Sequence, residues 1–499
     1  MELLDHAILG LTTALTFQNL IYAFVGCLLG TLIGILPGLG PLATISMLLP
    51  LTYSLGPTAA LIMLAGIYYG AQYGGSTTAI IVNLPGESSA VVTALDGYQM
   101  ARQGKAGLAL ATAAISSFIA GTFATVFIML AARPLANLAF SFGPAEYFAM
   151  MVVGLLLATV LSNARLLESV AMVLVGVLLS TVGTDLTSGD ERFTFGITKL
   201  FDGLDFIVLA MAVFGFAEIV RNLGEDEDTV TGTAKITRLM PTRAELKQML
   251  APATRGTMLG SILGVLPGGG AALASFASYA LEKRVSRNPE QFGKGHMAGV
   301  AGPEAANNAA AQTSFIPLLT LGMPSNGVMA LMIGAMMIHD ITPGPRVMTS
   351  DPALVWGLIA SMWIGNLILV VLNLPLVGLW VRLLAVPYRL LYPAIMLLCC
   401  IGAYSLKNDS FEVMLCAVML LGGYAIVLLR LPPAPMLMGF VLGPMLEENL
   451  RRVLLISRGD FAALVGSPIS IGFYLLAAVA LLTMALPNLR RKREVLDED

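Results

Sequence analysis

The residues best suited to chemistry in this chain are small and polar, and they lie between long apolar stretches. One group falls in Gly70–Gly107 and another in Gly299–Asn326. Backbone N–H groups can hold a small anion, whereas hydroxyl, amide and carbonyl oxygens suit a small cation. The candidate anion ligands are Gly38, Gly40, Ser76, Thr77, Gly86, Ser88, Gly268, Gly270, Pro324, Ser325 and Asn326. The candidate cation ligands are Asn83, Asn307, Asn308 and Thr320.

A helix-breaking motif that occurs twice must position many of these residues. Gly26–Gly40 reads GCLLGTLIGILPGLG, and a shift of 230 residues (256 − 26) gives Gly256–Gly270, GTMLGSILGVLPGGG, identical at 8 of 15 positions. Glycines at intervals of four leave one helix face bare, so that a neighbouring backbone can approach. The Leu-Pro-Gly then ends the helix and frees peptide groups for a ligand. A packing motif followed by an ordinary loop is the alternative.

Each half also contains a second break. In the first half, Asn83-Leu84-Pro85-Gly86 ends an apolar stretch, and Glu87-Ser88-Ser89 can cap the next helix. In the second half, Asn307-Asn308 takes the place of Ser76-Thr77-Thr78, and Pro324-Ser325-Asn326 takes that of Pro85 to Ser89. We therefore expect four breaks that converge on one site. A surface loop is the alternative for the first polar group.

The composition is that of a polytopic membrane protein. Of 499 residues, 57% are hydrophobic and only 12% are charged, and the mean hydropathy is +0.82. At roughly 20 residues a span, the length allows about 12 crossings. We expect an all-α fold of two internal, inverted repeats with broken helices and re-entrant hairpins. The predicted divisions are a first repeat at 1–220, a hydrophilic linker at 221–255 and a second repeat at 256–499.

Other function classes find little support in the sequence. It contains neither H-E-x-x-H nor G-x-S-x-G, and its three histidines are scattered. No basic tract with interleaved aromatic residues suggests nucleic-acid binding. We expect no enzymatic activity and no cofactor or metal beyond a coupling ion, Na⁺ or H⁺. Charged residues that could carry protons or clamp a carboxylate, most of them expected at segment ends, are Glu87, Asp96, Glu304, Asp340 and Arg346.

Two predictions concern individual segments. Leu108–Leu130 is a full span that Arg133-Pro134 should end, and Tyr147–Leu161 with Leu167–Val182 should form an antiparallel helix pair. Basic clusters on both sides of Gly256–Leu281 favour a cytoplasmic location for both of its ends. This stretch should then enter and leave the membrane by one face, and Gly26–Tyr53 should form the opposite hairpin.

Five longer motifs resemble one family, the large membrane subunit of tripartite tricarboxylate transporters (TctA). They are GxLPGLGP at Gly34–Pro41, YYGAQYGGSTTAIIVNLPGE at Tyr68–Glu87, GPEAANNAAA at Gly302–Ala311, PLLTLGMPSN at Pro317–Asn326 and GPMLEENLRR at Gly443–Arg452. The resemblance implies cation-driven uptake of di- or tricarboxylates across the bacterial inner membrane. It also implies a small membrane subunit and a periplasmic solute-binding protein as partners. A passive anion channel, or a carrier for another small organic anion, is the alternative.

Overall fold

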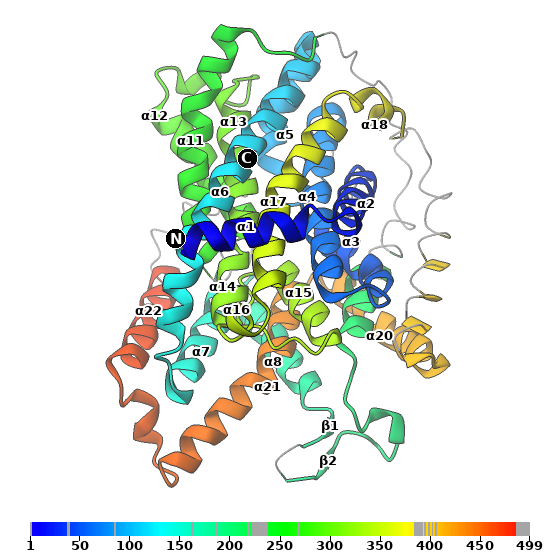
Figure 1. Ribbon diagram of the computed structural model, residues 1–499, viewed down its shortest axis with the longest axis vertical. Coiled ribbons are helices and arrows are strands. Elements are labelled where there is room, and N and C mark those ends of the chain that lie inside the picture. Colours follow the sequence, from blue (N-terminus) through cyan, green and yellow to red (C-terminus); the bar gives the residue numbers. More distant parts are fainter. Residues whose placement is uncertain are drawn as a thin grey trace.

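Nearly every described segment of the computed structural model is helical (Figure 1). The structure describes residues 2–36, 40–83, 86–160, 164–185, 188–216, 220, 238–266, 270–383, 393, 396–397, 400–401, 403–404 and 407–485. The first part of the predicted linker, 221–237, lies outside these residues.

The helices of the two halves follow the chain in order. The first half contains α1 (Glu2–Ala14), α2 (Phe17–Gly34), α3 (Pro41–Leu48), η1 (Leu49–Thr52), α4 (Pro57–Val82), α5 (Val91–Met100), η2 (Ala101–Lys105), α6 (Ala106–Ala139), α7 (Pro144–Val160), α8 (Leu166–Ser180), η3 (Thr198–Leu200), α9 (Phe206–Ala210) and η4 (Met211–Phe216). The second contains α11 (Arg243–Val265), α12 (Gly270–Val285), η5 (Pro289–Gln291), α13 (Ala298–Thr313), α14 (Phe315–Leu321), α15 (Gly327–Ile338), α16 (Val347–Ser350), α17 (Pro352–Asn373), α18 (Val377–Leu383), α20 (Ser410–Leu428), α21 (Pro433–Ile456), η6 (Phe461–Val465) and α22 (Pro468–Ala485).

The predicted helical class is confirmed, with one small addition. Strands β1 (Gly183–Thr184) and β2 (Glu191–Arg192) pair antiparallel in the connection after α8. Among the described residues, four helical stretches are long and apolar enough to cross a membrane: Phe17–Gly34, Val91–Ala139, Pro352–Asn373 and Ser410–Leu428. Further apolar helices are shorter, so the total of about 12 spans stays a prediction.

In each half the glycine motif holds one helix closely against another. α2 packs on α4, and α11 packs on α13, with the glycines at the contact. A Cβ atom on any of these glycines would lie 2.2 to 2.4 Å from a carbonyl oxygen of the partner helix, closer than side chains pack. Only glycine therefore allows this approach. The facing pairs are Gly26–Met63, Gly30–Ile67 and Gly34–Ala71, then Gly256–Gly302, Gly260–Ala306 and Gly264–Ala310.

These facing pairs show which residues of α4 and α13 correspond. The residue that faces a motif glycine in the second half lies 239 positions after the residue that faces the equivalent glycine in the first half (302 − 63). This separation is nine residues more than the 230 that separate the two glycine motifs. This register pairs Ser325 with Gly86, in agreement with the sequence prediction. It pairs Asn307 with Tyr68 rather than with the Ser76-Thr77-Thr78 stretch, so that part of the prediction was wrong. The prediction aligned stretches of similar polarity, whereas the register depends on backbone contacts that polarity does not reveal.

α11 and α12 form a helical hairpin. The Arg255 guanidinium of α11 donates to both carboxylate oxygens of Glu282 of α12, at 2.8 and 2.5 Å, and so ties the two helices together. α11 itself begins at a capping box, in which the Thr242 N–H donates to the Glu245 carboxylate at 2.6 Å. That bond, with the Thr242 hydroxyl and Arg238, lowers the pKa of Glu245 to about 2. The hairpin is observed, and its re-entry into a membrane stays a prediction.

Basic segments from both halves meet at one end of the molecule. The Gln103 side-chain amide donates to the Lys294 carbonyl oxygen at 2.7 Å. A Cβ on Gly107, at the start of α6, would lie 2.3 Å from the Arg238 carbonyl oxygen. In Figure 1 this end carries α11, α12 and α13, whereas β1 and β2 lie at the opposite end.

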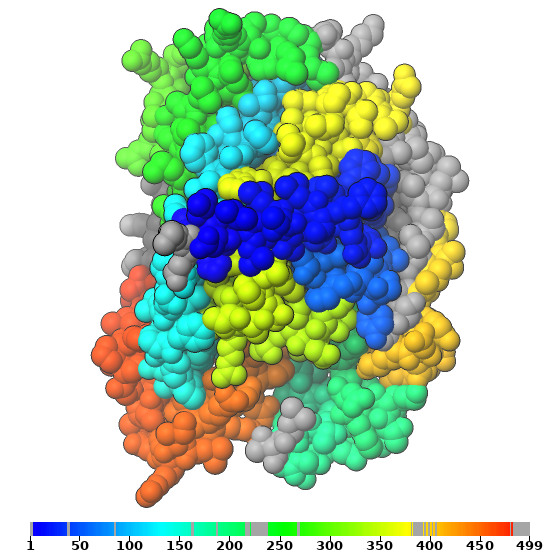
Figure 2. All heavy atoms as spheres, viewed as in Figure 1, coloured from blue at the N-terminus to red at the C-terminus, as the bar shows by residue number. Residues whose placement is uncertain are grey.

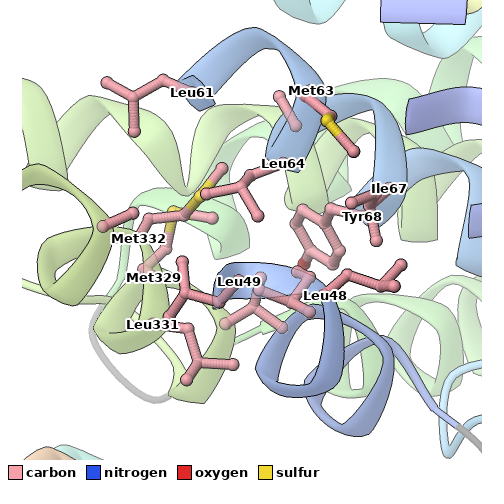
Figure 3. Packing of buried hydrophobic residues seen from close by; sticks show 14 of the residues in the cluster. Leu48, Leu49, Leu61, Met63, Leu64, Ile67, Tyr68, Met329, Leu331 and Met332 are labelled. Carbon is pink, nitrogen blue, oxygen red and sulfur yellow. The ribbon is translucent and has the colours of Figure 1, made fainter. Parts of the chain in front are cut away.

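One apolar cluster joins the two halves. Leu49 of η1, Leu64 of α4 and Met332 of α15 are all fully buried, and Figure 3 shows their side chains pointing toward one another. Inside a membrane such contacts act mainly through van der Waals packing, because lipid is as apolar as the side chains. The contact holds α15 of the second half beside α3 and α4 of the first.

The bounds of α6, α7 and α8 can be compared with the helix ends predicted from the sequence. α6 continues through Pro134 to Ala139, so the predicted end at Arg133-Pro134 was wrong. Neighbouring membrane helices can compensate for the backbone hydrogen bond that proline removes. α7 and α8 match the predicted helix pair closely.

The N-terminal helix α1 lies across the molecule, over the yellow-green α17 in Figure 2. The ring of His6 stacks on Trp356 of α17 with centroids 4.6 Å apart.

Candidate functional site

The breaks come together in pairs within each half. In the first half, a Cβ on Gly40 would lie 3.6 Å from the Gly86 carbonyl oxygen and 3.8 Å from Cβ of Glu87. In the second half, a Cβ on Gly270 would lie 4.0 Å from Cβ of Asn326. Because Glu87 and Asn326 correspond in the 239-residue register, these two contacts are equivalent. Each half therefore brings its first break against its second.

Contacts between the halves then join the two pairs of breaks. The Asn307 side-chain amide of α13 donates to the Glu87 carboxylate at 3.3 Å. The Tyr68 side chain of α4 lies near the Asn326 side chain. Asn307 corresponds to Tyr68, and Glu87 to Asn326, so these two neighbouring pairs are also equivalent. The break region is thus a shared centre to which both halves contribute in the same way.

Four helices begin at this centre. α3, α12 and α15 start directly after their breaks, and α5 starts at Val91, after a turn that follows Gly86. The N-terminus of a helix presents unpaired N–H groups and a partial positive charge, which favour an anion. At α15, the Asn326 side chain accepts from the Met329 N–H at 3.0 Å and caps the helix. The arrangement can therefore hold a small anion without a basic side chain.

Beside this centre, a cage of hydroxyl groups surrounds Glu304 of α13. The Ser76 hydroxyl donates to Oε1 of Glu304 at 2.8 Å, and the Thr93 hydroxyl donates to the same oxygen. The Ser117 hydroxyl reaches Oε2 at 3.4 Å, and the Asn308 amide donates to Ser117 at 2.7 Å. Glu304 is only 2% exposed. A buried carboxylate is costly unless hydrogen bonds or a cation compensate it.

A small cavity adjoins the cage. Its volume is about 10 Å³, room for about one particle the size of a water molecule. The oxygen-bearing side chains that line it are Tyr73, Ser76, Thr77, Glu304 and Asn373. Within the described part of the chain, Oδ1 of Asn373 has no hydrogen-bond partner, although its amide donates to the Leu369 carbonyl at 2.9 Å.

The predicted anion ligands that the structure describes lie at the breaks, beside the cavity or close to a break. Gly40, Gly86, Gly270 and Asn326 lie at the converging breaks. Ser76 and Thr77 are buried against the cavity. Ser88 is exposed just beyond the first-half break, whereas Pro324 and Ser325 are buried, with the Ser325 hydroxyl donating to the Ser314 carbonyl at 3.3 Å. Gly38 and Gly268 lie outside the described residues.

The predicted cation ligands are not all neighbours. Asn307 and Asn308 lie at the centre and at the cage, as described above. Asn83 is exposed and ends α4 in a left-handed conformation with φ of 59°. Thr320 donates to the Ile316 carbonyl oxygen of its own helix at 2.7 Å. Among described residues, neither Asn83 nor Thr320 is hydrogen-bonded to the two asparagines.

The sequence reasoning missed several residues of the cage and cavity. Thr93, Ser117, Tyr73 and Asn373 come from four separate helices, and no motif joins them. Glu304 was among the charged residues noted in the sequence, and its position inside α13, among small residues, was the available signal.

The other charged residues noted in the sequence differ in their surroundings. Asp340 and Arg346 are exposed outside the helices, as expected for segment ends. Asp96 is buried in α5 and accepts from the N–H groups of Gly295 and His296, at 2.8 and 2.7 Å.

Comparison with known proteins agrees with the resemblance seen in the motifs. The family model of the tripartite tricarboxylate transporter TctA family matches residues 20–438. A protein of Agrobacterium vitis, described as an uncharacterized 52.8 kDa protein in the TAR-I ttuC' 3'region, is 55% identical over 494 residues, which cover 99% of this chain and 98% of the relative. Another from the same organism, an uncharacterized protein in the TAR-II ttuC' 3'region, is 58% identical over 235 residues, 47% of this chain and 97% of the relative.

No solved structure matches the chain. The family match covers most of the sequence, including both glycine motifs and all four breaks. The chain belongs to the tripartite tricarboxylate transporter TctA family.

Proposed function

We propose that this chain is the membrane subunit that carries a di- or tricarboxylate across the bacterial inner membrane, driven by a gradient of Na⁺ or H⁺. The convergence of the four breaks is the observation that carries the proposal. Four helix N-termini face a centre built equally by both halves, which suits an anion that must be bound and then released.

The proposed partners follow from the family. A small membrane subunit and a periplasmic solute-binding protein would complete the transporter, and the binding protein would deliver the carboxylate to the membrane subunit. We propose that the substrate lies against Gly40, Gly86, Gly270 and Asn326, together with Gly38, Ser88, Gly268, Pro324 and Ser325 around them.

Transport by the reconstituted three-component complex tests this proposal. Proteoliposomes should accumulate a radiolabelled di- or tricarboxylate, such as succinate or citrate, and an ionophore that collapses the cation gradient should abolish accumulation. Flux that ignores every cation gradient would show a passive anion channel instead. Uptake restricted to other organic anions would reject the proposed substrate class.

Asn308→Ala provides the matching residue test. We expect it to abolish accumulation, because Asn308 holds Ser117 against Glu304, while insertion into the membrane stays normal. Full uptake by this variant would contradict a functional role for the cage.

A further inference from the structure

The cage and the cavity point to a site that the proposed transport cycle needs but that neither the motifs nor the family description assigns. We propose that Glu304 and the adjoining cavity form a binding site for one Na⁺ ion. This inference rests on the proposed function, since it names the coupling cation.

The charge around Glu304 is the first argument. Its carboxylate is buried in α13, and no basic side chain within the described residues pairs with it. Arg255 of α11 is instead paired with Glu282 of α12. A carboxylate in this position favours a positive partner in addition to its hydrogen bonds, and ionisable groups buried within a membrane protein commonly mark ion pathways.

The remaining titratable groups on the helices around α13 do not supply that partner. Tyr73 of α4 and Tyr279 of α12 are phenols, and the hydroxyl of Tyr279 donates to Asp96 at 3.0 Å. Asp96 of α5 and Glu87 in the first-half break are themselves acids. Within the described residues no side chain therefore balances the charge of Glu304, which leaves a bound cation or a proton.

The oxygen-bearing side chains that line the cavity are the second argument. Five side chains contribute one oxygen-bearing group each: a carboxylate, a phenol, two aliphatic hydroxyls and an amide. The hydroxyls of Ser76 and Thr77 donate elsewhere, to Glu304 and to the Tyr73 carbonyl, and so keep lone pairs for a ligand. Oδ1 of Asn373 is a buried acceptor without a partner among the described residues. A hard cation is what such a set of oxygens binds.

Charge and size select the ion. One carboxylate among otherwise neutral oxygens balances one positive charge, which favours a monovalent over a divalent cation. A proton would neutralise Glu304 without any need for a cavity lined by further oxygens. The volume of about 10 Å³ suits a single small particle rather than a hydrated ion.

The proposed Na⁺ site also occurs once, whereas each half has its own pair of breaks. In the register of the glycine contacts, Glu304 corresponds to Ala65 (304 − 239), so the first half has no equivalent carboxylate. The cage instead draws Ser76, Thr93 and Ser117 from the first half around Glu304 of the second. A bound Na⁺ would thus tie the halves together beside the centre, where Asn307 and Asn308 connect cage and break.

Direct binding of ²²Na⁺ to the purified full chain in nanodiscs tests the proposal independently of transport. Wild type should bind one Na⁺ that excess Na⁺ displaces and K⁺ does not. Glu304→Gln keeps the shape but removes the charge, and should abolish binding. Asn373→Ala lies outside the hydroxyl cage and should raise the Kd by at least about tenfold.

Ser117→Ala and Ser116→Ala form a matched pair on α6. Ser117 contacts Glu304 and should weaken Na⁺ binding, whereas the neighbouring buried hydroxyl of Ser116 makes no hydrogen bond to any described residue and its loss should leave the Kd unchanged. Gel filtration and membrane insertion report whether each variant is folded.

The outcomes separate this inference from the proposed function. Wild-type-like binding by both folded Glu304→Gln and folded Asn373→Ala would overturn the site. So would the absence of Na⁺ binding together with carboxylate uptake that follows a pH gradient in Na⁺-free buffer, because the cation would then be a proton. Failure to transport any carboxylate under every ion condition would instead refute the proposed function, whatever the Na⁺ binding shows.

Discussion

At the scale of single residues, Asn83 and Gly322 occupy equivalent places. They correspond in the 239-residue register (322 − 83), and both end a helix in the left-handed conformation, with φ of 59° and 70°. Glycine adopts this conformation freely, and asparagine is among the few other residues that tolerate it. The backbone alone therefore accounts for the residue type at Asn83, without the cation-binding role that its polarity suggested.

Asn83→Gly distinguishes the two roles. We expect this variant to retain carboxylate uptake within about twofold of wild type, because glycine preserves the left-handed helix end. Radiolabelled uptake in the reconstituted complex, with Asn83→Val as the strained counterpart, is the measurement. Loss of uptake by a folded Asn83→Gly protein would restore the side chain as a ligand.

At the scale of elements, the glycine contacts decide how α2 meets α4 and how α11 meets α13. They set the helix pairs close enough for the breaks to meet, and they explain why the motif is duplicated. Because no other side chain fits between the backbones, even one methyl group at these positions should disturb the packing.

Gly260→Ala tests that claim. Its Cβ would lie 2.2 Å from the Ala306 carbonyl oxygen, so we expect the free energy of unfolding to fall by about 1–3 kcal/mol. Gly422→Ala in α20 is the matched control, since its Cβ would meet nothing within 4 Å. Alanine there should leave stability unchanged or raise it by up to about 1 kcal/mol. Thermal unfolding in detergent compares the two, and equal midpoints would contradict the packing role.

The elements were more predictable than the site. The Gly-x-x-x-Gly spacing and the Leu-Pro-Gly ends carry their own physical reasons, so the sequence was enough to place the breaks. The cage and the cavity were not predictable, because Thr93 and Ser117 meet Glu304 only through the packing of α5 and α6 on α13, and Asn373 reaches the cavity only because α17 packs on α4 and α6. Asn307 was assigned to the wrong counterpart for a similar reason: polarity does not define helical register.

At the scale of the whole molecule, the breaks of both halves lie together at one centre, and the basic segments of both halves lie at the same end of the protein. If that end is cytoplasmic, as the distribution of Lys and Arg favours, the α11–α12 hairpin enters and leaves by the cytoplasmic face. Its break then lies near the middle of the membrane. There it would meet the breaks of the first half, and an anion could be reached from either side in turn.

Cysteine accessibility tests this arrangement most directly. Arg238 and Arg287 are both exposed, and they lie before and after the hairpin in the sequence. A single cysteine would be introduced at each of these positions into a cysteine-free variant. Intact cells and permeabilised cells would then be treated with an impermeant maleimide. We predict that both sites are protected in intact cells and labelled after permeabilisation. Labelling of only one in intact cells would mean that the hairpin crosses the membrane, and would contradict a shared midplane site.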